Sequence, residues 1–492
     1  MPGKFLRAAF RVLHSESRTL TAEEIVESAR KLNILDSAGK TPTNTMRARL
    51  SDDIRLLGGQ SSFQRVGPNR FGLREWGVGD YVWRPFQKSL PNETTVCVSG
   101  TIQQQLGFGG VGYSALPATL TAYLGIPRNL HFIDRPTAET TTKYKQLIAY
   151  AWLETADGLV LSYTRGKYSS AHRTLLLGRK SVGFGGHVLK QDAETLFGAS
   201  DGGTQQAAIR EIYEELSPKI SLQVRPAGVI WDDSSLEGQK HIGLVMHASL
   251  PHSSQIELKS GELSIKQVQL LRKEQLWEAY HAMEFWSQLL IREFAADAKP
   301  SVVSTIVPAV RPRKMRHMVL VGEIANGKSS IAAALASQRG YRVVSASSVL
   351  RKILKVKELD EQRRLEFQSI ALRFINTEDG PVRLAQAIAD EINRDGKRVA
   401  IIDGIRQINT LAALRRVVQD MTVIYIDCPR DIACRNYQGR VPGASILQFA
   451  AVREHEVEAE LPLFRYEADA ILNNADSLSN TVRLLLRWLD GN

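Results

Sequence analysis

The stretch that most directly indicates chemistry is residues 322–329, which read Gly-Glu-Ile-Ala-Asn-Gly-Lys-Ser. An apolar run at 318–321 precedes it and a helix-forming run at 330–335 follows it, which predicts a strand, a phosphate loop and a helix. Glycines at both ends let the backbone N–H groups point inward, and the helix adds its positive N-terminus. Lys328 would reach the outer phosphates of ATP, and the Ser329 hydroxyl would bind Mg²⁺. The expected nucleotide contacts are Gly322, Asn326, Gly327, Lys328, Ser329 and Ser330.

Three glutamates define a second candidate site. Glu211, Glu214 and Glu215 are spaced i, i+3 and i+4, so a helix places them on one face. Each like-charge pair at this spacing costs roughly 0.2–0.5 kcal/mol, which a divalent cation or the adjacent Arg210 can offset. The alternative is an exposed acidic face without a ligand. The glycine-rich segment 182–188 lies upstream of this helix.

Length and composition limit the class of protein. A chain of 492 residues exceeds the size of one hydrophobic core, so we expect about three domains. Hydrophobic residues at 43% and charged residues at 23% argue against disorder, and the net charge of +11 favours polyanionic partners. Cys97, Cys428 and Cys434 lack metal-like spacing, which fits a reducing cytoplasm. Because no run of about 18 apolar residues occurs, we expect no membrane span.

Residues 1–78 predict a small helical module with a wing. Apolar residues recur at helical spacing near the N-terminus, Thr21 to Glu24 form a capping box, and a third helix begins near Thr43. The segments Phe-Gln-Arg-Val at 63–66 and Arg-Phe-Gly-Leu at 70–73 flank a Gly-Pro-Asn turn and predict a hairpin. The segment resembles the HARE-type helix-turn-helix domain, an α+β winged helix. Its 13 Lys and Arg against 8 Asp and Glu give +5, so Arg47, Arg49 and Arg55 are candidate DNA contacts. The alternative is a protein-interaction winged helix.

Residues 80–295 contain the glutamate helix. The segments Val-Gly-Phe-Gly-Gly-His-Val at 182–188 and Arg-Glu-Ile-Tyr-Glu-Glu-Leu at 210–216 resemble the Nudix hydrolase box. Matches at 145–150, 165–168, 231–233 and 241–243 resemble a bacterial Nudix subgroup described as phosphoesterases. The resemblance implies an α/β/α sandwich with a mixed sheet, in which Glu211, Glu214 and Glu215 bind Mg²⁺ or Mn²⁺ and activate water for diphosphate hydrolysis.

This segment also departs from the Nudix pattern. Gly202 replaces the loop glutamate, and an insertion separates Gly186 from the helix, so Asp192, Glu194 or Asp201 would have to compensate. Ser217 and Pro218 alter the exit from the helix. The alternative is a domain that senses nucleotides without turnover. Residues 263–294 predict a helical tail that closes this domain or supports dimerisation, and the oligomeric state stays open.

A proline-bearing stretch at 296–312 predicts a linker, and residues 313–492 predict a doubly wound parallel α/β domain. Apolar strands at 341–345, 398–404, 422–427 and 470–474 alternate with helices, which places the site at the strand C-terminal ends.

The order of these segments resembles the nucleoside monophosphate kinase and dephospho-coenzyme A kinase group. The resemblance implies that Arg351 and Arg406 bind the acceptor phosphate, Arg435 and Arg440 meet the donor phosphates from a lid, and Asp403 orients Mg²⁺. The alternative for each arginine is a surface charge or a structural ion pair.

Taken together, these segments predict a three-domain protein that processes nucleotides. We expect Nudix-type hydrolysis of a diphosphate and ATP-dependent phosphoryl transfer to a nucleotide or related small molecule, with possible coupling of the two. The competing hypothesis is a nucleotide-sensing DNA-binding regulator or defence factor with weak or no turnover. The sequence does not identify either substrate.

Overall fold

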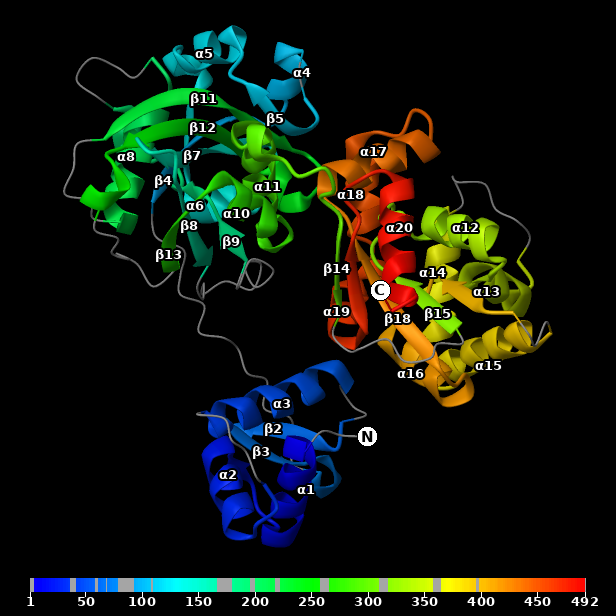
Figure 1. The fold of residues 1–492 in the computed structure, drawn as a ribbon. Helices are drawn as coiled ribbons and strands as arrows, with labels where there is room; N and C mark the ends of the chain where they lie inside the picture. The colour runs from blue at the N-terminus through cyan, green and yellow to red at the C-terminus, as the bar shows by residue number, and fades with distance from the viewer. Residues whose placement is uncertain are drawn as a thin grey trace. The chain divides into compact units, whose positions relative to one another are not determined.

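The computed structural model of the chain describes residues 4–35, 41–57, 61–67, 69–77, 93–107, 109–165, 179–194, 200–216, 222–256, 265–308, 317–356, 364–394 and 398–491. The chain divides into two compact units, Met1–Lys88 and Ser89–Asn492 (Figure 1). The first unit contains a three-stranded sheet. The second contains a ten-stranded sheet and a six-stranded sheet.

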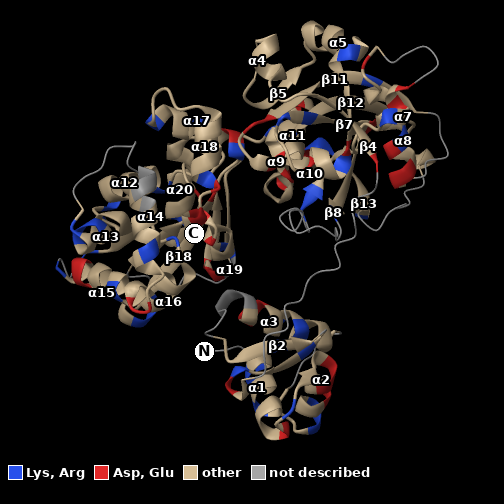
Figure 2. Cartoon of the chain, turned by 180° about the vertical axis from the view of Figure 1, so that it is seen from behind, with Lys and Arg blue, Asp and Glu red and all other residues tan. Residues whose placement is uncertain are grey.

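The first unit consists of three helices and a hairpin, as the sequence predicts. Its elements are α1 (Lys4–Glu16), β1 (Leu20–Thr21), α2 (Ala22–Lys31), α3 (Pro42–Leu57), β2 (Phe63–Gly67) and β3 (Arg70–Leu73). The capping box of α2 is confirmed, because the Thr21 hydroxyl accepts from the Glu24 N–H and the Glu24 carboxylate accepts from the Thr21 N–H. Met46 and Leu50 of α3 are buried in the core of this unit. Figure 2 shows basic and acidic residues on its helices.

The ten-stranded sheet is mixed and carries helices on both faces. Its main order is β13-β8-β7-β12-β11-β5; β7 and β12 are parallel and its other pairs are antiparallel. The elements of this region are β4 (Thr94–Ser99), α4 (Ile102–Leu106), β5 (Val111–Ala115), α5 (Ala118–Leu124), β6 (His131–Asp134), α6 (Arg135–Ala138), β7 (Tyr144–Thr155), β8 (Val160–Arg165), β9 (Lys180–Ser181), β10 (Gly183–Phe184), α7 (Lys190–Ala193), α8 (Thr204–Leu216), β11 (Gln223–Asp232), α9 (Leu236–Gln239), β12 (His241–Leu250), β13 (Ile265–Leu271), α10 (Lys273–Glu278) and α11 (Phe285–Phe294).

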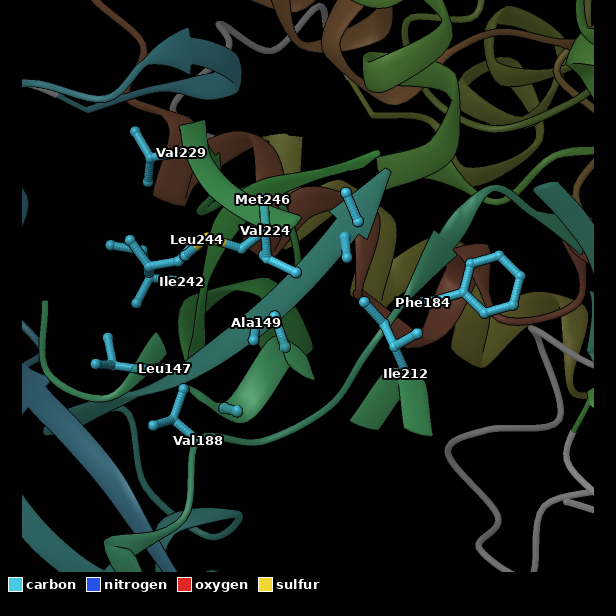
Figure 3. Packing of buried hydrophobic residues seen from close by; sticks show 14 of the residues in the cluster. Leu147, Ala149, Phe184, Val188, Ile212, Val224, Val229, Ile242, Leu244 and Met246 are labelled. Atoms are coloured by element: carbon cyan, nitrogen blue, oxygen red, sulfur yellow. The ribbon is translucent and has the colours of Figure 1, made fainter. Parts of the chain in front are cut away.

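Strand alternation divides the core of this sheet into two layers. Leu147 and Ala149 of β7 pack with Ile212 of α8, and Figure 3 shows this cluster around the sheet. Tyr150 and Trp152 belong to the other cluster, which includes residues of α10 and α11. Helix α8, which carries the glutamates, is therefore fixed to the sheet by its apolar face.

The predicted helical tail at 263–294 is wrong in its first part. Residues Ile265–Leu271 form β13, which pairs antiparallel with β8, and the helices begin only at Lys273. The apolar residues of this segment fit the periodicity of a helix or of a strand. It forms a strand because the edge of β8 is available for pairing. Within the expected linker, residues Thr305–Pro308 form β14 and pair with β19 of the next sheet.

The six-stranded sheet has the order β14-β19-β18-β15-β17-β16 and is parallel except for β14. Its elements are β14 (Thr305–Pro308), β15 (His317–Val321), α12 (Lys328–Arg339), β16 (Arg342–Ser345), α13 (Ala346–Leu354), α14 (Arg364–Ile375), α15 (Gly380–Asn393), β17 (Ala400–Asp403), α16 (Ile408–Val417), β18 (Met421–Asp427), α17 (Arg430–Arg440), α18 (Ile446–Arg453), α19 (Phe464–Glu467), β19 (Ala470–Asn473) and α20 (Leu478–Leu489).

Helices cover both faces of this sheet, as the doubly wound prediction requires. Residues of α12 and α20 pack on one face, and residues of α13, α14, α15 and α16 pack on the other. Within the described ranges, no helix has the length and apolar character needed to cross a bilayer. Cys97, Cys428 and Cys434 are all buried and free of disulfides.

Candidate functional site

The phosphate loop joins β15 to α12 and is shaped by two glycines. Gly322 has φ +144°, and a Cβ there would lie 2.3 Å from the carbonyl oxygen of Ile426. Gly327 has φ +95° and is the residue that caps α12, so side chains are disfavoured at both positions. Buried Asn326 donates to the Ile426 carbonyl at 3.0 Å, and Asn474 donates to the Asn326 carbonyl at 3.0 Å. These contacts hold the loop against β18 and the residues that follow β19.

Lys328, Ser329 and Asp403 meet where β15 and β17 end. The Lys328 ammonium donates to the carbonyl oxygens of Gly322 and Glu323 at 2.7 and 2.8 Å. The Ser329 hydroxyl donates to Asp403 at 2.7 Å, and Ser330 is exposed. Burial lowers the pKa of Lys328 to about 8, and the charge of Asp403 opposes this shift. The arrangement provides a half-buried cation, a hydroxyl and a carboxylate at one end of the sheet.

Two of the four predicted arginines act electrostatically on this lysine. Burial is the main cause of the lowered pKa of Lys328; the charge of Asp403 opposes it, and the positive charges of Arg406 and Arg440 lower the pKa further. Arg406 also pairs with Glu458, and Arg440 is exposed beside the ring of Tyr437. Arg406, which was predicted to bind the acceptor phosphate, therefore has a carboxylate partner that the sequence did not indicate.

The other two predicted arginines have local partners. Arg351 on α13 donates to the Ser348 hydroxyl at 3.3 Å. Arg435 on α17 is exposed and pairs with Asp431 at 3.0 Å, four residues earlier. These contacts do not join either arginine to Lys328, so their phosphate-binding roles stay predictions.

Sequence reasoning missed a cation beside the phosphate loop. Glu323, inside the loop, pairs with Arg453 at the end of α18. Arg465 pairs with Asp427 at the end of β18. A carboxylate within an anion-binding loop needs a neutralising cation. The presence of Glu323 in the loop could therefore have indicated that a basic residue lies beside it. The identity of that cation depends on the fold, because 130 residues separate the partners.

Helix α17, which carries Arg435 and Arg440, is anchored to elements of the mixed sheet region. Arg292 of α11 donates to both oxygens of buried Asp431 at 2.8 Å. Arg430 donates to Asp232 at 2.8 Å and lies over the ring of Phe285. Burial opposes ionisation of Asp431, but the hydrogen bond and charge of Arg292 lower its pKa below the ordinary value.

We expect Arg292→Ala to destabilise the second unit by about 2–3 kcal/mol, less than the roughly 3–5 kcal/mol of a fully buried pair because Arg435 remains. The thermal unfolding midpoint measures this loss. Because the pKa of Asp431 is lowered, the stabilisation is present above the ordinary carboxylate pKa of about 4 and is lost as the pH falls further. The matched control is Arg435→Ala, whose exposed pair contributes about 0–1 kcal/mol. Equal losses in the two variants contradict this assignment.

The three glutamates of α8 occupy different environments. Buried Glu215 accepts from the Gly185 N–H at 3.1 Å. A Cβ at Gly186 would lie 2.7 Å from the Glu211 carboxylate, so these two glutamates face the glycine loop. Glu214 has a side chain that is 52% exposed and pairs with Arg210 at 3.3 Å. The helix thus brings Glu211 and Glu215 to the loop and turns Glu214 toward solvent.

The residues proposed to replace the missing loop glutamate have other partners. Asp192 is buried and held by Arg210 at 2.9 Å, and Asp201 accepts from the N–H groups of Gly203 and Gln205 at the start of α8. Glu194 pairs with Lys190 on the surface. The backbone at Gly202 has φ +69°, which glycine adopts readily. Ser217 and Pro218 lie outside the described residues.

In the first unit, Arg47 and Arg49 are exposed on α3. Arg47 donates to Asn69, which follows β2 in the hairpin turn, at 2.7 Å. Arg55 is on the same helix, and its side chain lies outside the described residues. Arg47 therefore places a positive charge where α3 meets the hairpin turn.

Residues 3–76 match the family model HARE-HTH, whose description names the helix-turn-helix domain of ASXL proteins and restriction endonucleases. The first unit contains a HARE-HTH domain. Residues 324–441 match the model AAA_17, described as an AAA domain. This match spans most of the phosphate loop, Asp403, Arg406 and α17, and with the parallel sheet it identifies a P-loop kinase-like domain.

The individual proteins and solved structures that this chain resembles have low sequence identity to it. Protein YmaB of Bacillus subtilis (strain 168) is 28% identical over 168 residues, which cover 32% of this chain and 74% of YmaB. The structure of Tm1382, named as a candidate Nudix hydrolase, is 20% identical with a TM-score of 0.34 and covers 42% of this chain and 99% of its own. Shikimate kinase from Acinetobacter baumannii is 16% identical with a TM-score of 0.26 and covers 36% and 94%. Because these TM-scores are low, the activity of this chain must be inferred from the residues of its own sites.

Proposed function

We propose that the P-loop domain transfers a phosphoryl group from ATP to a nucleotide or a related small molecule. The convergence of Lys328, Ser329 and Asp403 at the ends of β15 and β17 carries this proposal. ATP supplies the phosphoryl group, and Mg²⁺ neutralises its phosphate oxygens. Phosphoryl transfer needs positioned positive groups and little covalent help from the protein, which fits this set of residues.

The residues present suit both expected ligands. Asp403 Oδ1 is buried and has no hydrogen-bond partner among the described residues, so it is available to a cation or its water. The glycines leave space for phosphate oxygens to approach the backbone at the N-terminus of α12. Lys328 would exchange its two carbonyl partners for phosphate oxygens, and Ser329 with Asp403 would hold Mg²⁺.

Arg406 and Arg440 would contribute positive charge on opposite sides of the reaction. Arg406 follows Asp403 by three residues and suits the acceptor phosphate, and Arg440 at the end of α17 suits the donor. Incubating purified full-length protein with ATP, Mg²⁺ and a panel of nucleotides and small alcohols tests the proposal by product analysis. Failure to form any phosphorylated acceptor would contradict it.

A second activity, metal-dependent hydrolysis of a nucleoside diphosphate derivative, is proposed for the mixed-sheet domain. The placement of Glu211 and Glu215 against Gly185 and Gly186 favours it. These oxygens and the exposed Glu214 suit Mg²⁺ or Mn²⁺, which supply an activated water when bound. Calorimetric binding of a nucleotide without any hydrolysis would instead favour a sensing role, as in a regulator or defence factor.

For the HARE-HTH domain we propose duplex DNA as the partner. The +5 charge of residues 1–78 and the exposed Arg47 and Arg49 favour phosphate contacts. In the full chain, Arg47→Ala with Arg49→Ala should weaken DNA binding and reduce the salt slope by about two, since each phosphate contact contributes about −0.9. Fluorescence anisotropy at several salt concentrations measures the slope.

The matched control removes two charges from another helix of the same domain. Arg30→Ala with Lys31→Ala changes exposed residues of α2 and should leave the salt slope as in wild type. If both double variants change the slope equally, binding responds to net charge and not to α3. If wild type does not bind DNA at low salt, the domain is a protein-interaction module.

A further inference from the structure

A cluster of two histidines and one glutamate lies beside the glycine loop of the mixed-sheet domain. It contains Glu139 at the end of α6, His187 directly after Gly186, and His241 at the start of β12. The Glu139 carboxylate is 3.7 Å from His187 Nε2 and 3.9 Å from His241 Nε2, and the three candidate ligand atoms all lie within 4.8 Å of one another. The segments that supply them are far apart in sequence and meet only in the fold.

Each side chain is largely withdrawn from solvent. The exposed fractions are 18% for Glu139, 10% for His187 and 14% for His241, so this is not a solvated surface group of charges. The two imidazole rings lie 5.6 Å apart at 70°, and their Nε2 atoms approach the same carboxylate. A shared carboxylate with two converging ring nitrogens is a metal-ligand geometry.

The backbone and its neighbours fix the two histidines. His241 Nδ1 is 2.7 Å from the Glu237 carbonyl oxygen, which can only accept, so Nδ1 carries the proton and Nε2 keeps its lone pair. Arg210 donates to the His187 carbonyl at 3.0 Å, and His187 forms a bridge with Ile148 of β7. Hydrogen bonds of this kind, made behind the ligand atoms, orient the side chains that bind metals in proteins.

We propose that Glu139, His187 and His241 bind a divalent transition-metal ion such as Zn²⁺. Imidazole nitrogens favour zinc and its neighbours over Mg²⁺, which prefers an all-oxygen set like that of α8. Donors roughly 2.0–2.1 Å from a tetrahedral zinc lie about 3.4 Å apart, so the cluster needs only a small contraction. The ion would replace the 3.3 Å contact between Gln146 Nε2 and His241 Nε2.

Three protein ligands leave one coordination position open, which is the pattern of catalytic rather than structural zinc. His187 directly follows Gly186, where a Cβ would lie 2.7 Å from the Glu211 carboxylate, so the glycine loop links the cluster to α8 along the chain. The ion would serve there as a Lewis acid or as a binding point for an anionic substrate group. Zn²⁺ binding itself does not depend on the proposed hydrolase activity.

The test is a Zn²⁺ titration of metal-free, full-length protein by calorimetry with excess Mg²⁺ present to fill oxygen sites. We expect one Zn²⁺ to bind, and His187→Ala, His241→Ala and the volume-conserving Glu139→Gln to weaken binding at least about 100-fold. The control is His247→Ala, which changes another imidazole of β12, one that pairs with Glu154 outside the cluster, and should bind Zn²⁺ as wild type does.

Cobalt absorption supplies a second readout. Co²⁺ in this site should give the visible bands of a four- or five-coordinate ion in wild type and His247→Ala, and those bands should be lost in the cluster variants. No Zn²⁺ binding by wild type, complete displacement by Mg²⁺, or wild-type affinity in the cluster variants would each overturn the proposal. The wild-type titration decides the question even where a variant fails to fold.

Discussion

Replacing Lys328 with alanine is expected to reduce phosphoryl transfer from ATP by about 10²–10³-fold, the loss typical of removing one preorganised group from a transition-state site. The half-buried ammonium donates to the Gly322 and Glu323 carbonyls, so it is held where the outer phosphates would lie. Burial lowers the pKa of Lys328, and the negative charge of a bound phosphate would raise it again. Turnover and ATP affinity, measured on the full chain, check this expectation.

Lys352→Ala is the matched control. This lysine lies on α13 of the same domain, is exposed, and pairs with Glu391, so its loss should leave transfer unchanged. Thermal unfolding of both variants establishes that they fold. Turnover by Lys328→Ala equal to that of wild type would exclude the phosphate loop as the reaction site.

The phosphate loop was predictable from sequence because its chemistry is local. Strand, glycine turn and helix are adjacent in the chain, and the strand that ends at Asp403 is an apolar run followed by an acid. The parallel order then brings β15 beside β17, so Ser329 meets Asp403 across 74 residues by a rule of sheet topology. No separate signal for that contact is needed.

The ion-pair partners of the arginines were not predictable in the same way. Arg406 with Glu458, and Glu323 with Arg453, join segments whose pairing depends on how α18 and the turn after it pack. Many carboxylates in the sequence fit each arginine equally well. Strand β13 shows the same limit for secondary structure, since the available edge of β8, not the residues themselves, decides between strand and helix.

The glutamate helix was predictable, whereas the difference among its glutamates was not. Spacing places the three carboxylates on one face, but only packing against Gly185 buries Glu215 and leaves Glu214 exposed. His187 and His241 stood within the recognised segments without an assigned role. Their convergence on Glu139 depends on how the residue after α6, the glycine loop and the start of β12 pack together, which the sequence does not specify.

Replacing Glu215 with glutamine is expected to reduce the rate of metal-dependent diphosphate hydrolysis by more than about 100-fold. Losing a group that only orients a metal ligand costs roughly 10–100-fold, and Glu215 is proposed to be a ligand itself. The amide oxygen can still accept from the Gly185 N–H, so the loop should keep its shape while the site loses an anionic ligand. Initial rates across a Mg²⁺ and Mn²⁺ titration check the result, and a higher metal requirement should accompany the lower rate.

Glu214→Gln and Glu194→Gln distinguish the loss of a metal ligand from the loss of any nearby negative charge. Glu214 is on the same helix but half exposed and paired with Arg210, so its loss should have a smaller effect than that of Glu215. Glu194 pairs with Lys190 on the surface, and its variant should hydrolyse as wild type does. Phosphoryl transfer by the P-loop domain should be unchanged in all three variants, because the substitutions remove no group near Lys328. If Glu214→Gln impairs hydrolysis more than Glu215→Gln does, the ligands lie on the exposed side of α8 and the buried carboxylate only supports the glycine loop.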